Sequence, residues 1–155
     1  MNRTIDVCLS PELMHLYSVD DASVVIVDIL RATSCMTTAC AHGIGSIKTF
    51  AGLPECLALK GQGYLTAGER DGKKVDGFDL GNSPFEYMDG AVTGKKLAFT
   101  TTNGTQAIAK AASAKEIIIG SFLNLSAVVN YLRKTPNNVL VVCSGWKGKV
   151  NLEDT

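Results

Sequence analysis

The sequence has no long hydrophobic run, no excess of charge of one sign and no paired cysteines. No stretch approaches the roughly 18 consecutive apolar residues of a membrane span, and the first residues lack the apolar region of a secretory signal. Lys and Arg number 15, and so do Asp and Glu, which argues against a nucleic-acid binder. Five cysteines without a C-x-x-C pair disfavour a disulfide framework and a zinc site. We therefore expect a cytoplasmic protein without a membrane or nucleic-acid partner.

Standard nucleotide motifs and catalytic histidine pairs are also missing. The chain contains no G-x-x-x-x-G-K-[ST] loop, and Gly43-Ile44-Gly45 lacks the third glycine of a dinucleotide fingerprint. Only two histidines occur, and neither follows a predicted buried strand, which disfavours Ser-His or Cys-His catalysis. The sequence therefore offers no signature of a nucleotide-binding enzyme or of a hydrolase with a histidine base.

The chain does have an ordinary globular composition in which strand and helix patterns alternate. With 155 residues, 46% of them hydrophobic, we expect residues 1–155 to form a single α/β domain. Leu125, Val128, Val129 and Leu132 show the complete i, i+3, i+4, i+7 spacing of a helix. Further helices are predicted at residues 33–43, 53–61 and 106–114, and strands at residues 4–9 (an edge strand), 23–27, 46–51, 64–67, 97–100, 116–119 and 139–142. This alternation predicts a three-layer α/β/α sandwich with a parallel or mixed sheet.

The order of predicted elements suggests an internal repeat. Residues 24–70 and 96–145 show the same succession of strand, polar loop, small-residue helix, strand, helix and strand, at an offset of 72 residues. Four identities accompany this offset and carry little weight by themselves: Thr33, Ala39, Phe50 and Leu53 fall on Thr105, Ala111, Phe122 and Leu125. We state two repeated βαβαβ units as a hypothesis, which requires matching strand directions and connections.

Residues 71–94 differ from the rest of the chain. Gly and Asp are dense and periodicity is weak, apart from a short helix that Ser83 and Pro84 open. A loop this long within one domain is usually functional or disordered. Disordered segments tend to lack apolar anchors, and this one has five, at Phe78, Leu80, Phe85, Tyr87 and Met88. We therefore expect an ordered loop that covers a site.

Polar residues follow five of the predicted strands at the point where each ends. Asp28 and Arg31 follow the strand V-V-I-V, and Glu69 and Arg70 follow another. The other three ends lie at residues 100–105, 120–124 and 143–145. Because the carboxyl ends of parallel strands meet at one edge of a sheet, we expect these groups to lie close together. Arginines and helix N-termini bind anions, and carboxylates beside an anion suit Mg²⁺, so the pattern predicts a phosphate-bearing substrate with Mg²⁺.

Simpler explanations exist for each of these groups taken singly. Asp28 with Arg31, and Glu69 with Arg70, are also suited to plain ion pairs. Residues 102–105 are equally suited to a turn and a helix cap, because Asn-Gly is a common turn dipeptide. Jointly these explanations are weaker, because five separate loops would all have to be polar at the same edge without a purpose.

Five motifs together resemble the 2-phosphosulfolactate phosphatase family. They are D-I-L-R-A-T-S at 28–34, G-E-R at 68–70, G-F-D-L-G-N-S-P-F-E at 77–86, T-T-N-G-T at 101–105 and L-E-D-T at 152–155. The resemblance spans about residues 5–155. It implies a Mg²⁺-dependent phosphatase of α/β/α fold that hydrolyses (2R)-2-phospho-3-sulfolactate to 3-sulfolactate, on a route towards coenzyme M, or acts on a related 2-hydroxy-acid phosphate monoester. Family members continue beyond the E-D-T motif, so we expect this chain to be the N-terminal portion of a longer protein.

With this resemblance, specific roles can be expected for the polar residues. We expect Asp28, Glu69 and Asp154 to supply oxygen ligands to Mg²⁺, and Arg31 and Arg70 to clamp the phosphate and acid groups of the substrate. Asp28, Arg31, Glu69 and Arg70 are thus the predicted catalytic set. The predicted substrate-binding set is Thr33, Ser34, Asn82, Ser83, Thr102, Asn103, Gly104 and Thr105.

The attacking group, water or a side chain, is left open, and a homo-oligomer is allowed. A small phosphorylated hydroxy acid is the expected partner. Two alternatives from other classes stay open at this point: a non-catalytic binding domain for a small phosphorylated or carboxylated metabolite, and a structural fragment that binds a protein partner.

Overall fold

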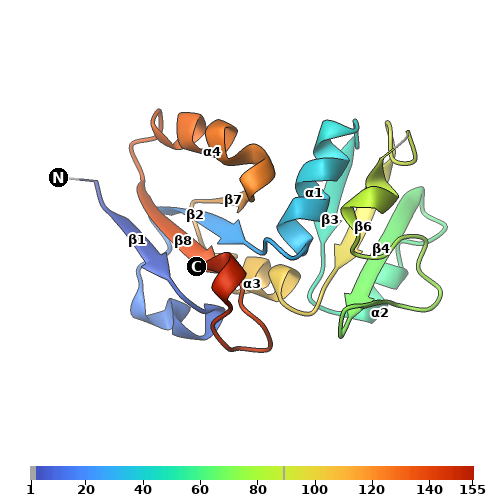
Figure 1. The fold of residues 1–155 in the computed structure, drawn as a ribbon, viewed down its shortest axis with the longest axis horizontal. Helices are drawn as coiled ribbons and strands as arrows, with labels where there is room; N and C mark the ends of the chain where they lie inside the picture. Colours follow the sequence, from blue (N-terminus) through green and yellow to red (C-terminus); the bar gives the residue numbers. More distant parts are fainter. Residues whose placement is uncertain (1–2, 89) are drawn as a thin grey trace.

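Two four-stranded sheets form the framework of the chain in a computed structural model that describes residues 3–88 and 90–155 (Figure 1). The first sheet has the order β1 (Ile5–Cys8), β8 (Asn138–Cys143), β2 (Ala22–Val27), β7 (Glu116–Gly120). The second has the order β3 (Ser46–Thr49), β6 (Lys96–Thr100), β4 (Tyr64–Arg70), β5 (Lys73–Lys74). Every strand pair is parallel except β4 with β5.

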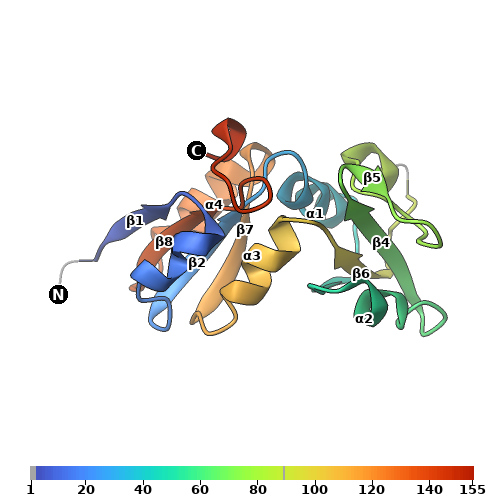
Figure 2. The same cartoon turned by 90° about the horizontal axis from the view of Figure 1, so that it is seen from below.

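Helices cover both faces of each sheet (Figures 1 and 2). On the first sheet, α3 (Gly104–Lys110) packs its alanines against Val24 and Leu140, and α4 (Leu125–Leu132) lies on the opposite face. On the second sheet, α1 (Ala32–Ala41) packs against Leu97 and Phe99, and α2 (Leu53–Leu57) places Cys56 against Ala98 on the other face. The small side chains of α1 and α3 let these helices approach the strands closely. Short 3₁₀ helices complete the described part of the fold: η1 (Pro11–Leu16), η2 (Pro84–Tyr87), η3 (Phe122–Asn124) and η4 (Leu152–Asp154).

The structure confirms the predicted α/β class, with mostly parallel sheets flanked by helices. The division into two sheets was not expected. The predicted edge strand is β1, and the strand predicted at residues 64–67 continues to Arg70, so that Glu69 belongs to it. A β-α-β-α-β order occurs twice, from β2 to β4 and from β6 to β8. The repeat itself stays a prediction.

The segment after β4 packs against that strand. Leu80 forms a parallel bridge with Ala67, and the Phe78 ring lies where a Cβ on Gly68 would meet it at 2.8 Å. The Tyr87 hydroxyl donates to the Gly81 carbonyl at 2.5 Å. Residue 89 of the predicted 71–94 loop lies outside the described residues, and the role of this loop as a cover stays a prediction.

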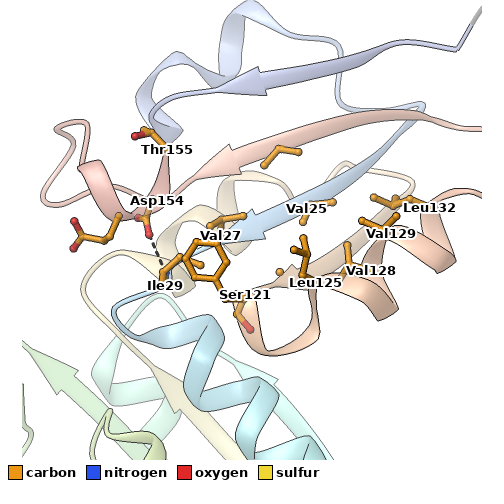
Figure 3. Close-up of a pocket in the computed structure, with 14 residues that line it drawn as sticks. Val25, Val27, Ile29, Ser121, Leu125, Val128, Val129, Leu132, Asp154 and Thr155 are labelled. Carbon is orange, nitrogen blue, oxygen red and sulfur yellow. Dashed lines mark hydrogen bonds between the residues drawn. The ribbon is translucent and has the colours of Figure 1, made fainter.

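An apolar groove separates α4 from the first sheet (Figure 3). Leu125, Val128, Val129 and Leu132 line a cavity of about 240 Å³ together with Val25 of β2. The helix predicted from their spacing is therefore confirmed, although none of its residues is buried. Within residues 3–88 and 90–155, no helix is both long and apolar enough to cross a membrane.

Candidate active site

The candidate site is built around Asp28, at the carboxyl end of β2. The preceding β-branched residues form a central strand, which leaves the carboxylate 6% exposed just where the strand ends. Its Oδ1 accepts the backbone N–H of Ala32 in the first turn of α1, at 3.0 Å. A buried carboxylate is costly unless its oxygens are paired, so its position at the end of a central strand marks this residue for chemistry.

Two further buried carboxylates act on Asp28 by their charge and accept backbone N–H groups just beyond strand ends. The Glu69 oxygens accept the N–H of Thr102 at 3.1 Å, its hydroxyl at 3.0 Å, and the N–H of Gly72 at 2.6 Å. Asp154 accepts the N–H of Ile29 at 2.8 Å, which Figure 3 shows, and that of Gly145 at 2.9 Å.

The ends of β2, β4, β6 and β8 thus meet, as the sequence predicted. The fifth predicted strand end, which follows β7, forms its hydrogen bonds with other residues. Ser121, after β7, bonds to Thr37 and Asn124.

Burial and neighbouring carboxylates raise the proton affinity of Asp28. The pKa of Asp28 is raised from 3.8 to about 6, mainly by burial and also by the charges of Asp154 and Glu69, against the N–H groups of Ala32 and Gly104, which lower it. Burial also raises the pKa of Asp154. A cation among these three groups would relieve both the burial penalty and the repulsion.

Two threonines lock the strand ends through their hydroxyl groups. Thr33 accepts the N–H of Asp28 at 3.0 Å and donates to its carbonyl at 2.8 Å. Thr105 accepts the N–H of Thr101 at 3.0 Å and donates to its carbonyl at 3.0 Å. Ser34 likewise donates to the carbonyl of residue 29 at 2.7 Å. These hydroxyls, predicted to bind substrate, are bonded to the backbone and shape the loops of the site.

Gly104 brings the two sheets together at Asp28. A Cβ at this position would lie 2.6 Å from the Cβ of Ala32 and 2.7 Å from Asp28 Oδ2. Only glycine permits this approach, which lets the Gly104 N–H act on the carboxylate. The predicted T-T-N-G-T loop is therefore in direct contact with the predicted acid.

The two predicted arginine clamps have different surroundings. Arg31, the N-cap of α1, makes one long hydrogen bond, at 3.5 Å to the Gly72 carbonyl, which leaves guanidinium donors for a ligand. Arg70 donates to the carbonyls of residues 69 and 51 and to the hydroxyl of Thr100 at 2.9 Å. Arg31 is thus the better placed of the two to hold an anion, and Arg70 ties β4 to β6.

The cover-loop residues lie on the second-sheet side. Asn82 is 7% exposed, and its Oδ1 has no hydrogen-bond partner among the residues that the structure describes. Ser83 is the N-cap of η2 and is half-buried. No described contact joins either residue to Asp28, so their part in substrate binding stays a prediction.

The oxygen ligands of the site suit a Mg²⁺ ion that is shared with a substrate phosphate better than a metal ion that is bound by protein side chains alone. In the part of the chain that the structure describes, no three His, Cys, Asp or Glu side chains are placed so that they could together hold a metal ion. Mg²⁺ is usually held by one or two carboxylates, with waters and substrate phosphates completing its shell. Asp28, with Glu69 and Asp154 beside it, meets that requirement, because both neighbours already spend oxygen lone pairs on backbone N–H groups.

Two residues near the site were not singled out from the sequence as binding residues. Ser144 follows β8 and is 2% exposed, and its Oγ has no hydrogen-bond partner within residues 3–88 and 90–155. The N–H of Lys147 donates to Asn103 Oδ1 at 2.9 Å. The polar strand end at 143–145 was a signal for Ser144, whereas nothing local marks Lys147.

The fold and the site define an α/β protein with an acidic, arginine-flanked centre suited to a phosphorylated anion. Comparison with known proteins gives the family. The sequence model of the 2-phosphosulpholactate phosphatase family matches residues 8–155, and the chain belongs to that family.

Three bacterial relatives illustrate the similarity, each named "probable 2-phosphosulfolactate phosphatase". The chain is 45% identical over 150 residues to the Thermotoga maritima protein, covering 97% of this chain and 63% of that protein. It is 44% identical over 138 residues to the Caldanaerobacter subterraneus subsp. tengcongensis protein, covering 86% and 57%. The Carboxydothermus hydrogenoformans protein is 43% identical over 152 residues, covering 97% and 62%. The chain therefore spans less than two thirds of the length of these relatives.

Proposed function

We propose that this chain carries the catalytic centre of a Mg²⁺-dependent phosphatase. Its substrate is 2-phospho-3-sulfolactate, hydrolysed to 3-sulfolactate and phosphate, or a related 2-hydroxy-acid phosphate monoester. The observation that carries the proposal is the buried Asp28, whose pKa the charges of Glu69 and Asp154 raise, with Arg31 in the loop that follows β2. Family membership and the names of the relatives support it.

The residues of the site have distinct proposed roles. Arg31 would bind and orient the phosphoryl group, because its guanidinium offers several donors to phosphate oxygens. Asp28 would hold Mg²⁺, with Glu69 and Asp154 as ligands through water, and the ion would supply charge neutralisation at the phosphoryl group and a lowered pKa for water. Glu69 and Asp154 also keep the loops rigid through their backbone hydrogen bonds, which limits reorganisation during the reaction.

We place the protein in the cytoplasm, on a route that consumes phosphorylated sulfonates such as the one leading to coenzyme M. All five cysteines are free, which supports a reducing compartment.

A phosphate-release assay on the complete gene product tests the proposal. A panel of 2-phospho-hydroxy acids is incubated with Mg²⁺ or with a chelator. We expect release with Mg²⁺ only, and release that persists in chelator would refute the metal requirement. Thermal stabilisation by the same compounds without any release would instead indicate a binding domain.

A further inference from the structure

Each sheet is assembled from both halves of the chain in a crossed arrangement. In the first sheet, β2 lies between β7 and β8, and in the second sheet, β6 lies between β3 and β4. All four pairings are parallel. The succession β2-α1-β3-α2-β4 therefore corresponds in topology to β6-α3-β7-α4-β8. The loop after β4 corresponds to the loop after β8, and the end of β2 to the end of β6.

The carboxylates of the site follow this correspondence. Glu69, at the end of β4, accepts the N–H of Thr102, the second residue beyond β6. Asp154, in the segment after β8, accepts the N–H of Ile29, the second residue beyond β2. Each acid thus holds the strand end of the opposite half, and the site has two corresponding sides with Asp28 between them.

The helix caps follow the same correspondence. Arg31, the N-cap of α1, donates to the carbonyl of Gly72 in the loop after β4. Asn103, the N-cap of α3, accepts the N–H of Lys147 in the loop after β8. Arg31 therefore corresponds in position to Asn103, and on the Asn103 side the basic side chain is that of Lys147, whose backbone N–H Asn103 accepts.

A cavity of about 230 Å³ lies on the Lys147 side, between the turn at residues 102–103 and the loop at residues 144–148. Ser144 lines it, and the Ser144 hydroxyl is buried without a hydrogen-bond partner among the described residues. A buried polar group in this state costs free energy until it finds an acceptor or donor. Thr102 and Asn103 also line the cavity, and Gly104, the next residue of the same loop, is the one that approaches the Asp28 carboxylate.

The charged groups around the cavity leave donors for an anion. Lys110 and Lys147 both line it, together with Glu12. Lys110 pairs with Glu12, and Lys147 pairs with the exposed carboxylate of Asp71. An ammonium group has three N–H donors, so each lysine keeps donors beyond its one carboxylate partner.

We propose that this cavity, with Ser144 and Lys147 as donors, binds the second acid group of the substrate, while Arg31 on the corresponding side holds the phosphate. The ligand class is a small organic anion that carries a phosphate and at least one further acid group, either carboxylate or sulfonate. This assignment rests on the proposed phosphatase function of the site.

The test compares three substrates on the complete gene product and its variants Ser144→Ala and Lys147→Met. The substrates are 2-phospho-3-sulfolactate, 2-phospholactate and isopropyl phosphate, which carry two, one and no acid groups besides the phosphate. Lys149→Met is the matched control, because Lys149 is exposed in the same loop and does not line the cavity. Thermal unfolding of Ser144→Ala should not occur below the wild-type midpoint, because the hydroxyl that it removes has no partner.

We expect both cavity variants to raise KM at least tenfold for an acidic substrate and to leave kcat/KM for isopropyl phosphate unchanged. An increase in KM that is confined to 2-phospho-3-sulfolactate assigns the cavity to the sulfonate. An increase in KM with both acidic substrates assigns it to the carboxylate. Unchanged KM values, an equal loss on isopropyl phosphate, or the same loss in Lys149→Met would overturn the proposal.

A binding measurement separates this proposal from the phosphatase proposal. Calorimetric titration with malonate and sulfoacetate does not depend on turnover. If wild type releases no phosphate but binds these dianions, and Lys147→Met weakens the binding at least tenfold, the cavity assignment stands while the phosphatase function fails. Equal binding by wild type and Lys147→Met overturns the cavity assignment whatever the turnover.

Discussion

Asp28→Asn should stabilise the folded protein at neutral pH even though it destroys the proposed activity. Burial, together with the charges of Asp154 and Glu69, raises the pKa of Asp28 from 3.8 to about 6. The folded protein therefore binds this proton more tightly than the unfolded chain, and stability falls as the pH rises from about 4 to about 6. This difference in pKa between the folded and the unfolded state corresponds to a loss of about 3 kcal/mol of stability at pH values above about 6.

Replacing Asp28 by asparagine restores part of the stability that is lost when Asp28 ionises. Its carbonyl can still accept the N–H of Ala32, but its amide group faces the N–H of Gly104, where Asp28 Oδ2 lies close. A lost hydrogen bond and an unpaired buried donor cost about 1–2 kcal/mol. The net gain for Asp28→Asn at pH 8 is therefore about 1–2 kcal/mol, and near pH 4, where wild-type Asp28 is protonated, the variant should be about 1–2 kcal/mol less stable than wild type.

Urea unfolding of the complete gene product at pH 4.5 and pH 8, with chelator present, measures this difference. The exposed Asp20→Asn is the matched control and should shift neither midpoint. Adding Mg²⁺ at pH 8 should stabilise wild type and leave Asp28→Asn unaffected. An Asp28→Asn protein that is no more stable than wild type at pH 8, with an unchanged pH profile, would refute the reasoning.

Three further substitutions probe the contacts that hold the site. Gly104→Ala should lower stability by about 1–3 kcal/mol and abolish turnover, because its Cβ would collide with Asp28 and Ala32; wild-type values in urea unfolding and phosphate release would contradict this. Arg31→Lys should lower kcat/KM at least ~tenfold with an unchanged circular dichroism spectrum, because lysine lacks the guanidinium fork; a smaller loss argues against the clamp. Thr33→Val should cost about 1–3 kcal/mol, because the N–H of residue 28 loses its acceptor, and a neutral result in urea would show that water replaces it.

Local patterns predicted the elements of the fold but not their assembly. The run V-V-I-V before Asp28 and the spacing of Leu125 to Leu132 identify β2 and α4, because burial and helical periodicity act over a few residues. The division into two sheets depends on pairings such as Val24 with Ile117, which join segments far apart in the sequence. No local signal distinguishes those pairings from a single continuous sheet.

The same limit applies to the candidate site. Asp28 and Glu69 were recognisable as acids at strand ends, whereas Asp154 was expected only from the resemblance, and the charges of Glu69 and Asp154 both act on Asp28. The contact partners were not predictable. Thr33, predicted to bind substrate, turns its hydroxyl to the backbone, and the missing hydrogen-bond partner of Ser144 is visible only in the fold.

The most direct test of the central claim is the initial rate of phosphate release from 2-phospho-3-sulfolactate by the complete gene product and its Asp28→Asn variant, measured side by side. In saturating Mg²⁺, the wild-type protein should release phosphate and the folded variant should release none. Chelator should reduce the wild-type rate to that of the variant. Equal rates for the two proteins would contradict the assignment of Asp28 as the centre of the site.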